Sequence, residues 1–182
     1  EKVLDFCSAR PPGAGPRIVD VGTGCGAIAI AIAHNLPDAT VYATDISRDA
    51  LAVADLNRRR HAVEDRVHIW QGDLLESLRE PVDVVVSNLP YLRTGDIAGL
   101  PEDVKREPRR ALDGGVDGLR VLGRLMQQAE RCVRPGGCIL VEIAPDQLEP
   151  VSRMARDAVS GARVSFAMDL LGLPRVVAVE RY

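Results

Sequence analysis

Short runs of β-branched apolar residues alternate along the chain with longer stretches in which apolar residues recur every three or four positions. Such alternation is typical of βαβ units that build a parallel sheet. The short runs predict strands at residues 17–21, 40–44, 67–71, 82–87 and 138–143, and the longer stretches predict helices at residues 27–35, 47–60, 119–133 and 147–159. We therefore expect an α/β protein with helices on both faces of the sheet.

The last two predicted strands, at residues 162–167 and 175–179, are joined by a short turn-like segment that contains Gly172 and Pro174. A connection this short favours an antiparallel hairpin over a crossover. The result is a seven-stranded, mostly parallel sheet whose last strand is antiparallel. This architecture resembles the Rossmann-like fold of class I methyltransferases that use S-adenosylmethionine.

The composition indicates one globular domain over residues 1–182, because 46% hydrophobic residues in a chain of this length support one core and not two. A net charge of −3 gives no field that would attract a polyanion, and 3% aromatic residues are too few for stacking platforms. No apolar stretch approaches the roughly 20 residues that span a bilayer, and the first residues lack a signal-peptide pattern. We expect a cytoplasmic protein that binds neither nucleic acid nor membranes, with its oligomeric state left open.

The four cysteines, Cys7, Cys25, Cys132 and Cys138, form no CxxC pair and have no neighbouring histidine at metal-ligand spacing. This pattern favours reduced structural thiols over a metal site. We therefore expect no metal.

The segment 20–26, with the sequence DVGTGCG, follows the first predicted strand. Gly22, Gly24 and Gly26 allow a tight turn, so that main-chain N–H groups at the helix start can face an anionic group of a ligand. The spacing is GxGxG rather than the GxGxxG of dinucleotide-binding proteins, and Asp20 would repel a phosphate and attract an ammonium. A zwitterionic amino-acid group therefore fits this turn better than a pyrophosphate.

Acidic residues follow the next two predicted strands at the same edge of the sheet. Asp45 ends the second strand and is placed to hold ribose hydroxyls. Asp73 and Leu74 follow the third strand. Asp73 can accept a hydrogen bond from the amino group of adenine, and Leu74 can cover the adenine ring. The plainer interpretation is that Asp73 caps a short helix. The cofactor interpretation is favoured because open α/β sheets bind ligands at the carboxyl ends of their strands.

The sequence Ser87-Asn88-Leu89-Pro90-Tyr91 ends the fourth predicted strand and forms a polar turn over the sheet edge. The Asn88 side-chain oxygen and the following backbone carbonyl can together accept both hydrogens of one planar NH2 group. Pro90 restricts the backbone φ, and Tyr91 offers a flat face to the same group. With the glycine turn, this segment indicates methyl transfer from S-adenosylmethionine to an amide or aromatic amine nitrogen.

Together with these two turns, the segment 107–119, with the sequence EPRRALDGGVDGL, makes the chain resemble the HemK/PrmC family. Members of that family methylate the side-chain amide of a glutamine in bacterial peptide-chain release factors. The resemblance runs from about residue 17 onward and includes the segments 141–143, 146–147, 169–170 and 175–177.

The resemblance implies a substrate, a cofactor and a set of site residues. The substrate is a release factor, the methyl donor is S-adenosylmethionine and the product is S-adenosylhomocysteine. The residues that would hold the substrate glutamine are Asn88, Leu89, Pro90 and Tyr91. By matching position, the methionine end of the cofactor would lie against Gly22, Thr23, Gly24, Cys25 and Gly26, its ribose against Asp45 and its adenine against Leu74. With these residues, we also expect Asp20, Ile46, Asp73 and Asn88 to bind the cofactor.

The chain departs from the family at several points, among them Arg106 in place of a common tyrosine and Ala144-Pro145 in place of a Gly-aromatic pair. Leu89 replaces the first proline of the usual Asn-Pro-Pro-Tyr turn, so the acceptor carbonyl is kept but the turn loses some rigidity. Family members usually carry an N-terminal helical domain that helps to dock the release factor. We expect residues 1–182 to hold the methyltransferase domain without it.

Three other functions stay open from the sequence. An adenine-amine methyltransferase that acts on DNA or RNA would use the same turn, but it usually needs a basic groove, which the acidic balance disfavours. A nicotinamide-dependent dehydrogenase is disfavoured by the GxGxG spacing and by Asp73. A non-catalytic module with this fold is disfavoured by the intact Asn88, Pro90 and Tyr91.

Overall fold

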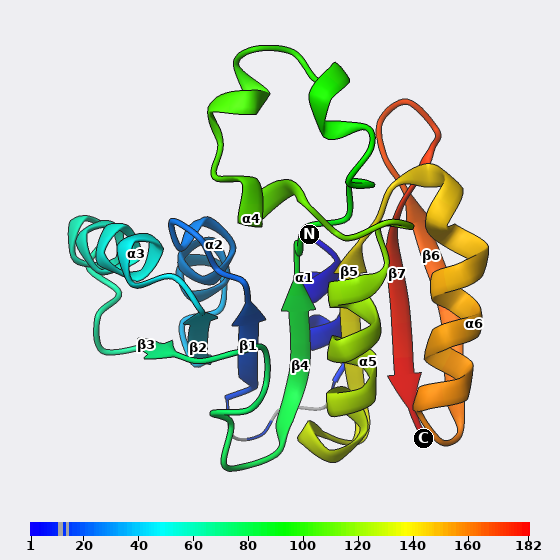
Figure 1. The fold of residues 1–182 in the computed structure, drawn as a ribbon. Helices are drawn as coiled ribbons and strands as arrows, with labels where there is room; N and C mark the ends of the chain where they lie inside the picture. Colours follow the sequence, from blue (N-terminus) through cyan, green and yellow to red (C-terminus); the bar gives the residue numbers. More distant parts are fainter. Residues whose placement is uncertain (11–12, 14) are drawn as a thin grey trace.

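The computed structural model describes residues 1–10, 13 and 15–182. Seven strands form one mixed sheet in the order β3-β2-β1-β4-β5-β7-β6 (Figure 1). The strands are β1 Arg17–Val21, β2 Thr40–Asp45, β3 Val67–Gln71, β4 Val82–Ser87, β5 Val133–Glu142, β6 Ala162–Met168 and β7 Pro174–Arg181. β1 to β5 are parallel to one another, and β7 is antiparallel to both β5 and β6. The predicted sheet and its closing hairpin are confirmed.

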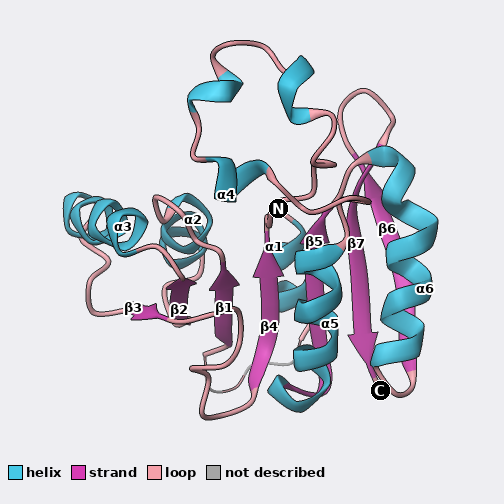
Figure 2. Ribbon diagram, viewed as in Figure 1, coloured by secondary structure: helices cyan, strands magenta, loops and turns pink. Residues whose placement is uncertain are grey.

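Helices cover both faces of the sheet (Figure 2). The helices of four or more residues are α1 Lys2–Ser8, α2 Ala27–Asn35, α3 Arg48–Arg60, α4 Arg109–Leu112, α5 Arg120–Cys132 and α6 Leu148–Ala158. Buried residues of α1 and α2 pack with one face of the sheet, and those of α5 and α6 pack with the other. On α5 the buried positions Leu122, Leu125, Met126 and Ala129 recur with helical spacing, which explains why the pattern predicted this helix. None of the described helices is long and apolar enough to cross a membrane.

The strand order reverses between β1 and β4, and this reversal fixes the position of the site. The chain winds outward from β1 to β3 and then returns to place β4 on the other side of β1. At such a point the connections leave the two strands in opposite directions, so a crevice opens at their carboxyl ends. The glycine turn that follows β1 and the Asn88 turn that follows β4 both lie there.

The segment between β4 and α5 rises over this end of the sheet (Figure 1). It contains two short 3-10 helices, η1 Ile97–Gly99 and η2 Val104–Arg106, and the single-turn helix α4. Another 3-10 turn, η3 Pro145–Gln147, lies between β5 and α6.

The structure differs from the predicted strands mainly at β5. This strand begins at Val133 rather than at residue 138, and its pairing with β4 shifts between Val82 and Val84. Val82 pairs with Val133 and Val84 pairs with Cys138, so the intervening residues bulge out of the ladder. Gly136 and Gly137, which are typical turn residues, therefore lie in a bulge inside the strand.

Candidate functional site

The glycine turn is held by its own backbone amides. The N–H groups of Gly22 and Thr23 both donate to the Thr44 carbonyl, at 2.8 and 2.9 Å. The N–H of Gly24 donates to Asp45 Oδ2 at 3.0 Å, and that of Gly26 donates to the Thr23 carbonyl at 2.9 Å. For these four amides, the expectation that they face an anionic ligand group is wrong, because each is already satisfied within the protein.

Asp20 lies beneath the glycine turn and is fully buried. Its Oδ2 atom accepts hydrogen bonds from Thr23 Oγ1 at 2.7 Å and from the Ala29 N–H at 3.1 Å. Its Oδ1 atom has no partner among the described residues. Burial raises the pKa of the Asp20 carboxyl from 3.8 to about 6, although the two hydrogen bonds lower it. Asp20 therefore supports the turn from below, and a direct contact with a ligand ammonium stays a prediction.

The shifted pKa of Asp20 predicts a pH-dependent stability. Between pH 4 and 6 the folded state holds a proton on Asp20 that the unfolded chain releases, so this group's contribution to stability falls as the pH rises. The variant Asp20→Asn has no such titration. Its free energy of unfolding relative to the natural chain should rise by about 2–3 kcal/mol between pH 4 and pH 7.5.

Urea unfolding of both proteins across this pH range measures the difference. The control is Asp5→Asn, which removes an exposed carboxylate of α1 that is paired with Lys2. A difference that does not change with pH would show that Asp20 titrates normally.

A cavity of about 420 Å³ lies beside the glycine turn, and we call it the glycine-loop cavity. It joins the carboxyl ends of β1, β2, β3 and β4 with parts of α4 and α5. The expected site residues that line it are Gly22, Gly24, Cys25, Asp45, Ile46, Asp73, Leu74, Asn88, Leu89 and Pro90. Gly24 has a φ of +56°, and a Cβ built on it would project into open space. The missing side chain therefore leaves room for a ligand against the turn.

Asp45 faces this cavity with a carboxylate that is already oriented. Its Oδ1 atom accepts from the Ser47 N–H at 2.8 Å, and its Oδ2 atom accepts from the Gly24 N–H at 3.0 Å. Each carboxylate oxygen has a second lone pair, so both can still accept from a ligand hydroxyl. The two backbone bonds fix the carboxylate beside the turn without using its full acceptor capacity.

Asp73 and Leu74 border the same cavity after β3. Leu74 is buried and has a φ of +54°, a left-handed conformation that is uncommon for a residue with a side chain. Asp73 Oδ2 accepts from Arg124 Nη2 of α5 at 2.7 Å. Asp73 therefore lies at the cavity in an ion pair with Arg124, which the sequence analysis did not predict.

The Asn88 turn combines an exposed side chain with a fixed backbone. Asn88 is exposed, whereas Leu89 is 5% exposed and packs in the core. The Leu89 side chain lies under the glycine turn, since a Cβ on Gly22 would come within 2.8 Å of Leu89 Cδ2. Just before the turn, Ser87 Oγ donates to the Val21 carbonyl at 2.9 Å. Core packing of Leu89 thus supplies some of the rigidity that a proline would give.

The segment 107–119 approaches the backbone of the Asn88 turn closely. A Cβ at Gly114 would lie 2.7 Å from the Pro90 carbonyl oxygen, and one at Gly118 would lie 2.3 Å from the Tyr91 carbonyl oxygen. The Tyr91 carbonyl also accepts from Gln147 Nε2 at 2.9 Å. These contacts explain physically why glycines stand at both positions.

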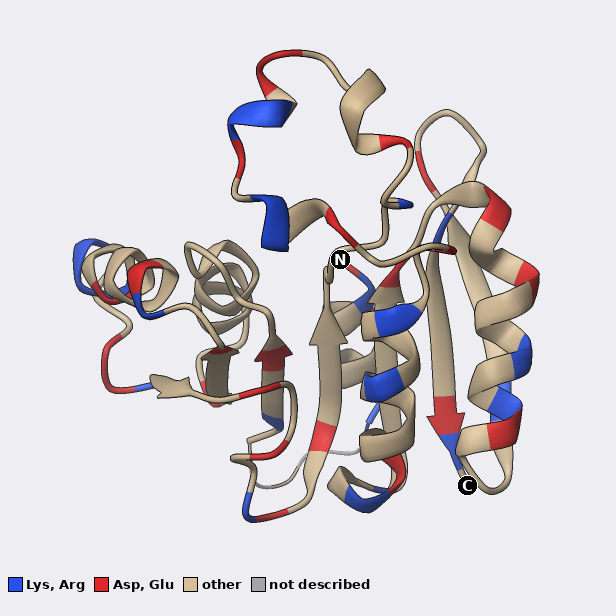
Figure 3. Ribbon diagram, viewed as in Figure 1, with Lys and Arg blue, Asp and Glu red and all other residues tan. Residues whose placement is uncertain are grey.

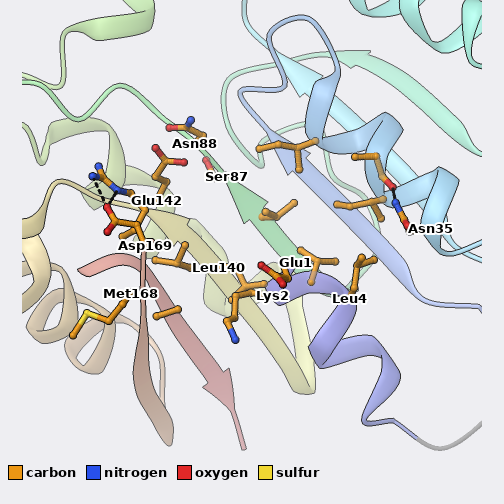
Figure 4. A pocket seen from close by; sticks show the side chains of 18 residues that line it. Glu1, Lys2, Leu4, Asn35, Ser87, Asn88, Leu140, Glu142, Met168 and Asp169 are labelled. Carbon is orange, nitrogen blue, oxygen red and sulfur yellow. Dashed lines mark hydrogen bonds and ion pairs between the residues drawn. The ribbon is translucent and has the colours of Figure 1, made fainter. Parts of the chain in front are cut away.

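A second cavity, also of about 420 Å³, opens on the other side of Asn88 (Figure 4). We call it the strand-end cavity. It lies among α1, α2 and the carboxyl ends of β4, β5 and β6, and its polar lining residues include Ser87, Asn88, Glu142, Asp169 and Arg175. Asn88 lines both cavities, so a ligand in one and a ligand in the other could meet at its side chain.

Tyr91 is half-buried and packs against the core. Its hydroxyl donates to Glu142 Oε1 at 3.3 Å. Burial, and next the charge of Glu142, raise the pKa of the Tyr91 phenol, so it stays protonated at neutral pH. Tyr91 is thus connected to the strand-end cavity through Glu142. The stacking of its ring on a substrate stays a prediction.

Several residues of the site were not assigned a role from the sequence. Arg110 and Arg124 border the glycine-loop cavity, and Glu142 and Arg175 border the strand-end cavity. Glu142 could have been predicted, because it ends a strand that neighbours β4 and ligands bind at the carboxyl ends of parallel strands. Arg110 and Arg124 carry no such signal, because their positions depend on how α4 and α5 pack.

The sheet order, the antiparallel β7 and the position of the two turns define the class I methyltransferase fold. A ribosomal protein L11 methylase from Lactobacillus delbrueckii subsp. bulgaricus superposes with a TM-score of 0.71 at 21% identity, covering 98% of this chain and 75% of that one. A methyltransferase from Pyrococcus furiosus gives a TM-score of 0.70 at 17% identity, covering 98% and 80%. At these identities the likeness concerns the fold alone.

The chain belongs to the methyltransferase small domain family, whose model matches residues 7–105. A release factor glutamine methyltransferase of Moorella thermoacetica is 50% identical over 140 residues, which are 76% of this chain and 50% of that protein. One from Gloeobacter violaceus is 41% identical over 177 residues, which are 96% and 60%. A ribosomal protein uL3 glutamine methyltransferase of Bradyrhizobium diazoefficiens is 41% identical over 133 residues, which are 72% and 42%. The chain thus spans about half to three fifths of the release factor relatives.

Proposed function

We propose that this chain is the catalytic part of a cytoplasmic protein glutamine methyltransferase that uses S-adenosylmethionine and acts on a peptide-chain release factor. The observation that carries the proposal is the place of Asn88, which lines the glycine-loop cavity and the strand-end cavity at once. The similarity to release factor glutamine methyltransferases supports the choice of substrate.

The residues of the glycine-loop cavity fit S-adenosylmethionine. Asp45 can accept from the ribose hydroxyls, and Leu74 offers an apolar surface to the adenine ring. The open space at Gly24 can admit the methionine part. When bound, the cofactor supplies a methyl group on a positively charged sulfur.

The Asn88 turn would hold the substrate glutamine in the strand-end cavity. Asn88 Oδ1 and the Leu89 carbonyl accept the two hydrogens of the side-chain amide and direct its nitrogen toward the glycine-loop cavity. An amide nitrogen is a weak nucleophile, because its lone pair is delocalised into the carbonyl. As nitrogen bonds to the methyl carbon, positive charge grows on it, and the two acceptors stabilise this charge more than they stabilise the neutral amide. The sulfur of the bound cofactor would keep the carbon–sulfur electron pair, and the nitrogen would then lose one proton to water.

The distribution of charge gives no support to a nucleic-acid substrate. Acidic and basic residues are interspersed along α3 and α6 and in the segment between β4 and α5 (Figure 3). Several arginines that could meet phosphates are paired with carboxylates, such as Arg58 and Arg59 with Asp55, and Arg124 with Asp73. A protein substrate is therefore favoured over a polyanion.

The experiment that tests this function offers the chain labelled S-adenosylmethionine with each of three substrates: a bacterial release factor, ribosomal protein uL3 and adenine-containing RNA. We expect label in the release factor, and mass spectrometry of its peptides should locate one added methyl group on a glutamine. Label in uL3 alone would change the assigned substrate and keep the chemistry. Label in the RNA alone would overturn the proposal.

A further inference from the structure

We propose that Glu142 is a specificity residue that makes the strand-end cavity select a neutral primary amide over a carboxylate. This inference rests on the proposed function, because it concerns the acceptor that the same cavity would hold. It explains how a glutamine side chain would be distinguished from the glutamate side chain, which has nearly the same shape.

The pairing of β4 and β5 brings Glu142 beside Asn88. Ser87 pairs with Val141 in the parallel register, so the next residues, Asn88 and Glu142, occupy matching positions at adjacent strand ends. Neighbouring strands lie roughly 4.8 Å apart. Both side chains line the strand-end cavity, and Figure 4 shows the Glu142 carboxylate next to Asn88.

The other charges of this cavity leave Glu142 without an ion pair among the described residues. The charged residues that line the cavity are Glu1, Lys2, Glu142, Asp169 and Arg175. Lys2 Nζ pairs with Asp5 at 3.0 Å. Arg175 holds Asp169 Oδ2 through two nitrogens, at 3.0 and 3.3 Å. The hydrogen-bond partner of Glu142 is the neutral Tyr91 hydroxyl.

The acceptor end of the cavity is therefore rich in hydrogen-bond acceptors. Asn88 and Glu142 line this cavity, and Leu89 follows Asn88 on the glycine-loop side. An acceptor nitrogen held at Asn88 would therefore lie among oxygen acceptors. An amide offers two N–H donors there, whereas an ionised carboxylate offers none and carries the same charge as Glu142. Two like charges about 5 Å apart at an effective dielectric constant of about 20 weaken binding by roughly 250-fold. Arg175, whose pKa the charge of Glu142 helps to raise, offsets part of this effect. Such a repulsive element excludes the wrong side chain.

Competition experiments test this role directly. The inhibitor is a release factor in which the acceptor glutamine is replaced by glutamate, and its Ki is measured against the intact release factor with the natural chain and with Glu142→Gln. Glutamine keeps the length of the side chain and can still accept from Tyr91 Oη. We expect Ki for the glutamate inhibitor to fall by about 10- to 100-fold in the variant.

The matched control is Asp146→Asn. Asp146 is an exposed carboxylate near the same end of the sheet, but it pairs with Arg93 rather than lining the strand-end cavity. Its removal should leave Ki unchanged. If Glu142 had a purely structural role, Glu142→Gln would change the melting temperature or kcat. The ratio of Ki for the glutamate inhibitor to KM for the intact release factor would then stay unchanged.

The outcomes separate this inference from the proposed function. If Glu142→Gln methylates the release factor but its Ki-to-KM ratio stays within twofold of the natural value, the role of Glu142 is overturned and the function stands. If the natural chain transfers no methyl group to the release factor, both fall. Should Glu142→Gln not fold, the natural chain gives a second measurement. A release factor with methionine at the acceptor position should then bind at least tenfold more tightly than the one with glutamate, and equal binding would overturn the inference.

Discussion

Replacing Asn88 with alanine should lower kcat for methyl transfer by about 1,000-fold. The Asn88 side-chain oxygen is one of two acceptors that hold the amide nitrogen and stabilise the positive charge that grows on it. Loss of one preorganised group of this kind typically costs 100- to 1,000-fold in rate. Because the side chain is exposed, its removal leaves no cavity in the core and should change the melting temperature little.

The same variant should bind S-adenosylmethionine with a Kd within about threefold of the natural value. Isothermal titration gives this Kd, and a labelled-methyl assay gives kcat. The important result is the separation of the two numbers, since Asp45 and the glycine turn are unchanged. Turnover near the natural rate would remove Asn88 from the mechanism.

Replacing Asp45 with alanine should weaken S-adenosylmethionine binding by at least 100-fold. The carboxylate would lose its hydrogen bonds to the ribose hydroxyls, and bonds to a charged group contribute about 1.5–3 kcal/mol each. The N–H groups of Gly24 and Ser47 would also lose their partner, so the turn itself should become less ordered.

Titration of Asp45→Ala with S-adenosylmethionine measures the first effect, and thermal unfolding without cofactor measures the second. The control is Asp49→Ala, which removes a carboxylate from the first turn of the neighbouring helix α3. A Kd for Asp45→Ala close to that of the control would exclude Asp45 from the cofactor site.

The sequence predicted most of the sheet because each inner strand is a short, continuous apolar run. Ile18, Val19, Val84 and Val85 are fully buried, as expected for strands covered on both faces. The rule that ligands bind at the carboxyl ends of parallel strands also pointed to the candidate site, where Asp45 and Asn88 border one cavity. These features depend on local pattern and on a general property of parallel sheets.

The remaining features depend on contacts between segments that are distant in the sequence. The pairing of Asp73 with Arg124 requires the packing of α5 against the end of β3. Asp20 is buried and lines neither cavity, because α2 packs over it and the Ala29 N–H of this helix donates to its carboxylate. Periodicity predicts that a helix exists, but it does not predict which of its polar residues will form ion pairs or hydrogen bonds with distant segments.

The central claim is that donor and acceptor meet at Asn88, and a crystal structure with S-adenosylhomocysteine and a glutamine-containing release factor peptide tests it most directly. We expect the sulfur of S-adenosylhomocysteine in the glycine-loop cavity and the glutamine amide nitrogen within hydrogen-bond distance of Asn88 Oδ1 and the Leu89 carbonyl. Binding of the cofactor product outside this cavity, or of the glutamine away from Asn88, would contradict the account.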